Sequence, residues 1–386
     1  MSAVASKTIL SGDQMMKKSP RFSKLRVENL EERTLLAVMA GGIEQAVTFP
    51  APTESTTWWV ATAEDTFEGD VLSLRDALAH NNKLLTKLNG YIIDTAGKQM
   101  RPMLCLLSAQ ACGEVSQMSY ECAAVCEIIH TATLLHDDVA DNGDMRRGVP
   151  TVKAVFSPAA SVLTGDYWLA KGMHLLINKC NVEILGHFTK ALHDLSVGEI
   201  IQMEKAEELD TTKEDYYKII ECKTASLFVA AVKSGAISAG APQKYIDAIA
   251  EYAYHLGLAF QMRDDIFDYS PKMDTGKLPG ADIKERKITL PLLCAMEAAP
   301  QEEARIRALI GGICSSIEKE STLSDSEKEI ITAVNDFIFK HNGIAKAQEI
   351  LEHHVSIATD ALSILPQSTA KERLTQLVQY VGNRNV

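Results

Sequence analysis

Apolar side chains recur at helical spacing along most of the chain. Leu78, Leu85, Leu88 and Ile92 lie three, four or seven positions apart, and similar spacing continues between Val125 and Leu135. Strict alternation of apolar and polar positions, which is typical of half-buried strands, is nearly absent. The pattern therefore predicts an all-α protein of ten or more helices.

Residues that favour turns interrupt this helical pattern. They are Gly97, Cys112-Gly113, Asn142-Gly143, the segment 240–242, Ser270-Pro271 and the segment 276–280. Apart from one acidic motif, no internal repeat is visible. We expect a single large helical bundle with a central cleft, rather than two independent domains.

The first 66 residues do not share this pattern. A basic stretch from Lys7 to Arg26 precedes a short apolar patch, Leu35 to Met39, and then Pro50-Ala51-Pro52. A signal peptide would need a longer apolar segment, and acidic residues such as Glu28 separate the basic and apolar parts. We expect a flexible leader at 1–66 and one helical domain at 67–386.

Composition and charge narrow the classes of function. The 386 residues are 46% hydrophobic, enough for a large core, and the formal net charge is -12. Such an acidic chain is a poor general partner for nucleic acid, and an anionic substrate would require metal ions or local Lys and Arg. No run of 18 apolar residues occurs, so no membrane span is expected.

The eight cysteines form no Cys-x-x-Cys pair, and most stand among apolar residues. Cys122 and Cys126 share a helix face, but no further His or Cys at zinc-binding spacing accompanies them. We therefore expect reduced, buried thiols and a cytoplasmic protein.

The strongest chemical signal is an Asp-Asp-x-x-Asp pattern that occurs twice, 127 residues apart, inside apolar helical stretches. Its carboxylates are those of Asp137, Asp138 and Asp141, and of Asp264, Asp265 and Asp268. Carboxylates at i and i+4 share a helix face roughly 6 Å apart, so each cluster needs a cation. Oxygen ligands favour Mg²⁺, which usually also binds substrate phosphate. An EF-hand does not fit, because Ala140 and Val149 occupy ligand positions of that loop.

Basic residues accompany both clusters. Arg146-Arg147 follows the first, and guanidinium groups suit phosphate. Lys98 and Arg101 stand at the turn into an apolar helix that begins near Pro102, where the helix dipole favours an anion. The remaining basic positions are Lys223, next to Thr224, and Lys277 and Lys287 after the second cluster.

Taken together, these motifs resemble the trans-polyprenyl diphosphate synthases, the chain-elongating prenyltransferases, over roughly residues 67–386. The matching segments are Gly97-Lys98-x-x-Arg101-Pro102, His130-Thr131-Ala132, Leu134 to Asp141, Arg146-Arg147-Gly148, Gly165-Asp166-Tyr167, Lys223-Thr224, Gln261 to Tyr269, and Lys287-x-Thr289-Leu290-Pro291. The resemblance implies the isoprenoid synthase fold and a homodimer. It also implies Mg²⁺-dependent condensation of an allylic diphosphate with isopentenyl diphosphate.

The resemblance also implies roles for individual residues. The aspartates of both clusters would hold Mg²⁺ on the allylic diphosphate, which Arg146, Lys223, Lys277 and Lys287 would contact. Isopentenyl diphosphate would be bound by Lys98, Arg101, His130 and Arg147. The oxygens of Thr224 and Gln261 would stabilise a carbocation. A deep apolar cleft would keep water from quenching it.

Product length depends on the helix that leads into the first cluster. Ala132 and Thr133, five and four residues before Asp137, are small, whereas short-chain relatives block the cleft there with an aromatic side chain. This favours a medium- or long-chain product of the octaprenyl or solanesyl type, with Ile128 and Ile129 as deeper walls.

Three alternatives remain at the level of sequence. A short-chain farnesyl or geranylgeranyl diphosphate synthase shares these motifs. A class I terpene cyclase usually has a different metal motif in place of the second Asp-rich one, and it would not need Lys98 and Arg101 to bind a second diphosphate. A regulatory subunit of a heteromeric synthase would tend to lose one of the two acidic motifs, and both are intact here.

Two positions depart from the family pattern: Glu285-Arg286 stands where Glu-Gly is usual, and Pro279 lies one place later than usual. Neither removes a ligand, so we expect activity.

Overall fold

The computed structural model describes residues 82–95, 99–146, 148–269, 280–314 and 324–383. The expected leader at 1–66 lies outside these ranges, as do the boundary at 67 and the side chains of Lys98, Arg147 and Lys277.

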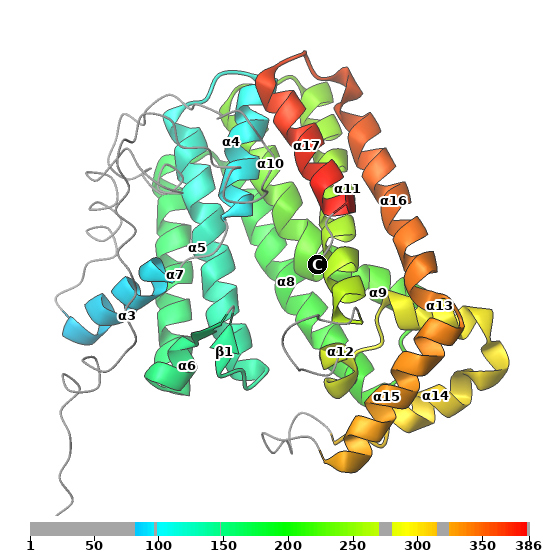
Figure 1. Cartoon of the computed structure of the whole chain (residues 1–386). Helices are drawn as coiled ribbons and strands as arrows, with labels where there is room; N and C mark the ends of the chain where they lie inside the picture. Colours follow the sequence, from blue (N-terminus) through cyan, green and yellow to red (C-terminus); the bar gives the residue numbers. More distant parts are fainter. Residues whose placement is uncertain (1–81, 96–98, 147, 270–279, 315–323, 384–386) are drawn as a thin grey trace, which may run out of the picture.

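Helices make up most of the described chain (Figure 1), which confirms the all-α prediction. The first half contains α3 (Lys83–Asp94), α4 (Met100–Cys112), α5 (Gln117–Ala140), α6 (Val152–Val155), α7 (Pro158–Lys179), α8 (Val182–Glu208) and α9 (Lys213–Ile220). A π-helical turn, η3 (Glu221–Ala225), leads into α10 (Ser226–Ser238) and α11 (Gln243–Asp268). The rest contains α12 (Ala281–Lys284), α13 (Leu290–Ala298), η4 (Pro300–Glu302), α14 (Glu303–Ile310), α15 (Asp325–Lys340), α16 (Gly343–Ala361), η6 (Leu362–Ile364) and α17 (Thr369–Asn383).

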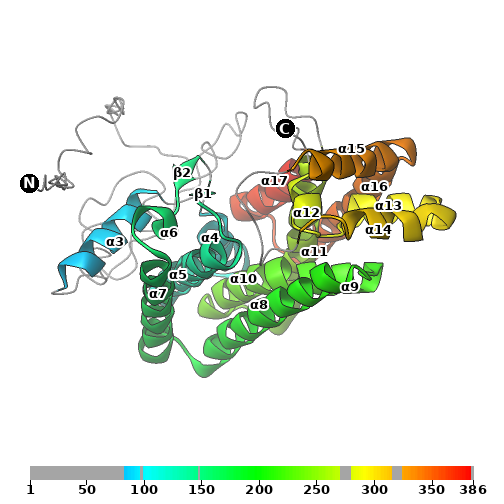
Figure 2. The same ribbon diagram turned by 90° about the horizontal axis from the view of Figure 1, so that it is seen from below.

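The long helices run side by side along one direction. Figure 1 shows α5, α7, α8, α10, α11 and α16 as roughly parallel rods. Seen from below in Figure 2, α3, α5, α6 and α7 gather on one side of α8 and α10, while α13, α14, α15 and α16 gather on the other. None of the helices in the described ranges has a stretch long and apolar enough to cross a membrane.

A small hairpin interrupts the helices after α5. The strands β1 (Met145–Arg146) and β2 (Val149–Pro150) pair antiparallel, with Met145 opposite Pro150. Strands of two residues are too short to produce an alternating pattern, so the sequence predicted only a loop here.

Two apolar clusters fill the bundle. One surrounds α11 and includes Phe228, Tyr252 and Leu256; the other lies between α5 and α7 and includes Ile129 and Trp168. All five of these side chains are fully buried or nearly so. Burial on this scale supplies the main favourable term in folding and fixes how the helices pack.

Local signals set the ends of α5, the helix that carries the first acidic cluster. Ser116 and Ser119 form a reciprocal capping pair at its start. At its end Asp141 is the C-cap, and Asn142 adopts a left-handed conformation with φ of 53°, as predicted for the Asn142-Gly143 break. The cluster therefore occupies the last turn of the helix.

Candidate functional site

Both acidic clusters stand at the C-terminal ends of their helices. Asp137 and Asp138 are in the last turn of α5, and Asp264, Asp265 and Asp268 close α11. Both helices run toward the lower end of the bundle in Figure 1. The C-terminus of a helix carries partial negative charge, so carboxylates there are repelled by their own helix. The site is thus strongly biased toward binding cations.

The charges of the first cluster act on one another. Burial, and then the nearby Glu199 carboxylate, raise the pKa of Asp137 to about 6, while Lys223 and Arg146 oppose this shift. Burial also raises the pKa of Asp141, against the opposing charge of Lys287. These shifts indicate that the carboxylates lie close together and that the protein's own cations compensate only part of their negative charge.

Lys287 links the two clusters electrostatically. Its charge opposes the rise in the pKa of Asp141 at the end of α5 and also that of Asp265 in α11, where burial is the main cause and the pKa reaches about 6. Burial lowers the pKa of Lys287, but Glu285 and Asp141 outweigh this and the net shift is upward. The two acidic ends therefore face a shared basic residue.

A cavity of about 160 Å³ lies between these elements. Four of the residues singled out from the sequence line it, namely Lys223, Gln261, Asp265 and Lys287. Two others that line it, Tyr216 and Asp282, were not singled out. The structure therefore brings together residues that lie up to 64 positions apart between Lys223 and Lys287.

A chain of hydrogen bonds joins three side chains that line this cavity, those of Tyr216, Gln261 and Asp265, to Thr224. Thr224 Oγ1 donates to Gln261 Oε1 at 2.7 Å, and Gln261 Nε2 donates to Asp265 Oδ1 at 2.9 Å. The hydroxyl of Tyr216 donates to the other carboxylate oxygen, Asp265 Oδ2, at 2.6 Å. Thr224 and Gln261, which the resemblance assigns to the carbocation, are thus in direct contact.

A second cavity, of about 100 Å³, gathers residues of the first cluster and of the hairpin. His130, Asp138 and Arg146 line it. Arg146 Nε donates to Asp138 Oδ1 at 2.7 Å, so the arginine that follows the cluster folds back onto it. Asp138 is only 6% exposed, and this ion pair compensates its charge.

The π-helical turn η3 presents Lys223 and Thr224. Such turns are rare and occur often at functional sites. Glycines from both neighbouring helices make room for it: a Cβ at Gly198 of α8 would lie 2.6 Å from Cys222 Cβ, and one at Gly257 of α11 would lie 2.6 Å from Ala225 Cα. Lys223 also forms an ion pair with Glu199 of α8.

The end of α11 is joined to α12 through Asp268. Its carboxylate accepts hydrogen bonds from the backbone N–H of Ala281 at 3.1 Å and of Asp282 at 2.9 Å. A carboxylate at a helix N-terminus is favourable, so Asp268 fixes the start of the segment that leads to Lys287. Asp282 itself is half-buried, and its loss of solvation, followed by the nearby Asp265 carboxylate, raises its pKa.

Arg286, one of the two departures from the family pattern, has a left-handed backbone with φ of 59°. Glycine adopts this conformation without strain, which explains the usual Glu-Gly sequence here. In this chain Arg286 Nη2 donates to the carbonyl oxygen of Glu207 at 3.1 Å. Pro279, the other departure, lies outside the described residues.

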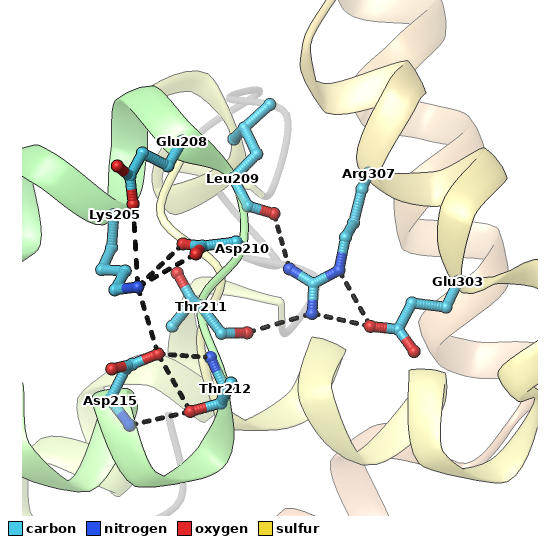
Figure 3. Close-up of polar contacts among 9 residues, drawn as sticks. All are labelled: Lys205, Glu208, Leu209, Asp210, Thr211, Thr212, Asp215, Glu303 and Arg307. Carbon is cyan, nitrogen blue, oxygen red and sulfur yellow. Dashed lines mark hydrogen bonds and ion pairs between the residues drawn. The ribbon is translucent and has the colours of Figure 1, made fainter.

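Lys205, near the end of α8, and Thr211, in the connection from α8 to α9, line the larger cavity. Figure 3 shows the polar contacts around this connection. Lys205 Nζ lies 3.0 Å from Asp210 Oδ1 and 3.5 Å from Asp215 Oδ2. Arg307 of α14 donates to the carbonyl oxygens of Leu209 at 2.6 Å and Thr211 at 3.0 Å. These contacts hold the connection in place, partly from its neighbouring helices α8 and α9 and partly from the distant α14.

The close approach of α7 to His136 explains why position 165 is a glycine. A Cβ at this position of α7 would lie 2.4 Å from His136 Nε2, so only glycine lets α7 approach the residue that precedes the first cluster. His136 Nε2 is 3.3 Å from Asp166 Oδ1. The motif Gly165-Asp166 thus positions the side chain of His136.

The remaining predicted site residues that the structure describes do not line the larger cavity. Arg101 lies in the first turn of α4, which begins near Pro102 as expected. Its guanidinium group lies 4.8 Å from the centre of the Phe228 ring. Ala132 is fully buried, and Thr133 is half-buried with its hydroxyl donating to the carbonyl oxygen of His130. Lys98, Arg147 and Lys277 lie outside the described residues.

Sequence reasoning missed Glu199, Tyr216 and Asp282. The first could have been found from Gly198-Glu199-x-x-Gln202, which places two polar side chains three residues apart beside a helical glycine. Tyr216 gave no such signal, because a tyrosine at helical spacing normally indicates the core. Asp282 lies in a short polar stretch that is typical of a loop.

The donor set suits Mg²⁺. All six clustered side chains are carboxylates, the hard oxygen ligands that this ion prefers. Among the described residues no group of three His, Cys, Asp or Glu converges closely enough to hold an ion by itself. Ligands from water and from a diphosphate would have to complete the coordination, as is usual for Mg²⁺.

Comparison with known proteins points the same way. The family model described as polyprenyl synthetase matches residues 82–325. The chain is 35% identical to an all-trans-nonaprenyl-diphosphate synthase (geranyl-diphosphate specific) of Rhodobacter capsulatus, covering 81% of this chain and 92% of that protein. It is 33% identical to the octaprenyl diphosphate synthase of Escherichia coli, covering 84% and 97%. A crystal structure of polyprenyl synthase from Caulobacter crescentus, complexed with calcium and isoprenyl diphosphate, superposes with a TM-score of 0.73 at 29% identity, covering 87% and 100%.

Proposed function

Because this chain belongs to the polyprenyl synthetase family, we propose that it condenses an allylic diphosphate with isopentenyl diphosphate to give a medium- or long-chain all-trans polyprenyl diphosphate. It is therefore a prenyltransferase. The names of its relatives, which make octaprenyl and nonaprenyl diphosphates, favour a long product over a farnesyl or geranylgeranyl one.

One observation carries this proposal. The C-terminal ends of α5 and α11, each closed by carboxylates, face a common region in which Lys223 and Lys287 oppose their charge. Such an arrangement suits a highly charged anion held between metal ions and basic side chains. A diphosphate fits that description, because its oxygens supply further ligands for metal ions that the carboxylates bind, whereas a neutral substrate would supply no such charge.

The first step breaks the C–O bond of the allylic diphosphate, and the bonding electrons leave with the diphosphate. Arg146, Lys223, Lys277 and Lys287 bind the departing anion. Lys223 is paired with Glu199 in the structure, so the diphosphate would compete with that carboxylate for the lysine. Aspartates from both clusters would hold Mg²⁺, which would further neutralise the charge that develops on the diphosphate.

The second step forms the new carbon–carbon bond. The double bond of isopentenyl diphosphate, held by Lys98, Arg101, His130 and Arg147, attacks the allylic cation, and a proton then passes to the released diphosphate. The side-chain oxygens of Thr224 and Gln261 stabilise the cation. The growing tail extends along α5 past Thr133 and Ala132 toward Ile128.

We also propose that the protein acts as a homodimer. Large apolar side chains on α7 and α8 are more than half exposed, and a second copy is the occupant that the family resemblance implies. They are Leu163, Ile177, Val182, Ile200 and Met203. Light scattering in solution tests this, because a monomeric mass contradicts it.

All eight cysteines are free thiols, which fits a cytoplasmic location.

The central experiment incubates the full chain with labelled isopentenyl diphosphate and farnesyl diphosphate, with and without Mg²⁺. We expect Mg²⁺-dependent consumption of isopentenyl diphosphate and a long product on thin-layer analysis. No consumption rejects the synthase. Consumption with a farnesyl or geranylgeranyl product identifies the short-chain alternative, and turnover of the allylic substrate alone to a hydrocarbon identifies a cyclase.

A further inference from the structure

Tyr216, which lines the larger cavity, stands at one end of the hydrogen-bonded chain. Its hydroxyl donates to Asp265 Oδ2 at 2.6 Å, and the chain continues through Gln261 to Thr224. The four side chains come from α9, η3 and α11, three separate elements. Neither acidic motif includes Tyr216.

Asp265 determines which way the amide of Gln261 points. An ionised carboxylate can only accept hydrogen bonds, so the group of Gln261 that faces it must be the NH₂. The amide oxygen is thereby turned toward Thr224, from whose hydroxyl it accepts a hydrogen bond. A flipped amide has the same shape but would present its positive end instead.

Tyr216 in turn determines where the carboxylate of Asp265 lies. Tyr216 is 3% exposed, Asp265 is 5% exposed, and both oxygens of Asp265 accept hydrogen bonds from protein side chains. Its neighbour Asp264, in contrast, is exposed. The two adjacent aspartates of the second cluster thus have different surroundings, although the sequence pattern treats them alike.

We propose that Tyr216 is a positioning residue for the proposed condensation, and that it acts through Asp265 to hold the amide oxygen of Gln261 toward the reacting carbons. In this arrangement Asp265 serves the hydrogen-bonded chain and is not a ligand of Mg²⁺. The inference rests on the proposed function and names further residues of the same site.

The first test replaces Tyr216 with Phe, which removes only the hydroxyl. We expect kcat to fall by about tenfold, equivalent to about 1.4 kcal/mol, while KM for both diphosphates stays within about twofold. The matched control is Tyr252→Phe in α11, which removes an equally buried hydroxyl that donates to the carbonyl oxygen of Leu374 at 2.8 Å. It should lower the melting temperature similarly and leave kcat unchanged. Equal kcat in wild type and Tyr216→Phe overturns the proposal.

The second test compares Asp265→Asn with Asp264→Asn. In the Asp265→Asn variant the new amide oxygen can still accept from Gln261, and the new NH₂ can donate to the Tyr216 oxygen, so the chain survives without the charge. We expect Asp265→Asn to keep the wild-type Mg²⁺ concentration for half-maximal rate, and Asp264→Asn to raise it by about tenfold or more. A matching rise in Asp265→Asn makes Asp265 a metal ligand and overturns this part of the proposal.

Wild-type protein separates this inference from the function on which it rests. If the wild type does not consume isopentenyl diphosphate, the proposed function fails. If it does, and Tyr216→Phe and Tyr252→Phe have the same kcat, only the positioning role of Tyr216 fails.

Discussion

Arg146 donates a 2.7 Å hydrogen bond to Asp138, eight residues earlier in the chain, across the turn between α5 and the hairpin. A residue proposed to bind diphosphate is thus already held against a residue proposed to bind metal. The ion pair sets the position of the guanidinium before substrate arrives, which lowers the cost of ordering that long side chain on binding.

Substitution of Arg146 should therefore weaken binding of the allylic substrate. We expect Arg146→Lys, which keeps the charge but loses the planar fork, to raise KM for the allylic diphosphate by about tenfold. The control is Lys153→Met, which removes a nearby lysine paired with Asp144 at 3.0 Å. Steady-state kinetics with each substrate varied in turn distinguish the two, and an unchanged KM in Arg146→Lys contradicts the assignment.

Removal of divalent cations should abolish turnover, because two carboxylate clusters at helix C-termini cannot hold a diphosphate unaided. A chelator tests this directly, with Mg²⁺ added back. Binding can also be followed without catalysis. Inorganic diphosphate together with Mg²⁺ should raise the melting temperature more than either alone. At a diphosphate concentration of about a hundred times its Kd, the folded state should gain about 2.7 kcal/mol of stability. Asp137→Asn should reduce that shift. An equal shift with diphosphate alone would show that metal is not involved.

Ala132 should control product length. We expect Ala132→Phe to shorten the product, because a bulky ring would fill the path along α5 that small side chains leave open. Chromatographic sizing of the products measures this. Since Ala132 is fully buried, the melting temperature must be compared as well, with Ala132→Val as a smaller change that should shorten the product less. An active Ala132→Phe enzyme with the wild-type product rejects the hypothesis.

Histidines between α11 and α16 should make stability fall at mildly acidic pH. His354 Nδ1 lies 2.7 Å from His255 Nδ1 and its Nε2 lies 3.2 Å from the hydroxyl of Tyr217. Burial, then His255 and His353, lower the pKa of His354 from 6.5 to about 4.

The unfolded chain therefore binds a proton at His354 between these two pH values, and the folded chain does not. Stability is lost as pH falls from about 6.5 toward 4. The difference in melting temperature between pH 7 and pH 5 should be smaller in His354→Asn than in the wild type. Equal differences in the two proteins would exclude His354 as the cause.

Arg286 should tolerate glycine better than alanine. Both substitutions lose the hydrogen bond to Glu207, but only glycine also relieves the left-handed backbone, which costs about 1 kcal/mol or more for other residues. We expect Arg286→Gly to melt roughly 2 °C above Arg286→Ala. The reverse order would show that the backbone of Arg286 is not strained.

The sequence was informative where the signal is local. Helical spacing predicted α5, turn residues predicted its end at Asn142, and the acidic motifs identified the two helix ends that meet. The sequence contains no signal for contacts between residues that are far apart in the chain. Tyr216 is 49 positions from Asp265, and nothing near either residue indicates their contact. The hairpin was missed because its pairing depends on two residues in each strand.

Both Asp-Asp-x-x-Asp motifs also illustrate the limit of a pattern. Spacing alone made Asp264 and Asp265 equivalent, but a helix turns by about 100° per residue, so adjacent side chains face different surroundings. One is exposed and the other is buried against Tyr216 and Gln261. Packing that no motif encodes thus gives the two aspartates different surroundings, and the proposed metal-binding role falls to Asp264 for that reason.

The π-helical turn at Glu221–Ala225 has a consequence for how this protein can vary genetically. Such a turn holds one residue more than an α-helical turn, so deleting a single codon there could join α9, η3 and α10 into one regular helix. The residues on either side of the deletion would then rotate by about 100° relative to each other. Side chains of α9, such as Tyr216, and side chains of α10 would lose their present relative orientation in one event. In-frame deletions at this point should therefore be lost from functional variants even where single substitutions survive.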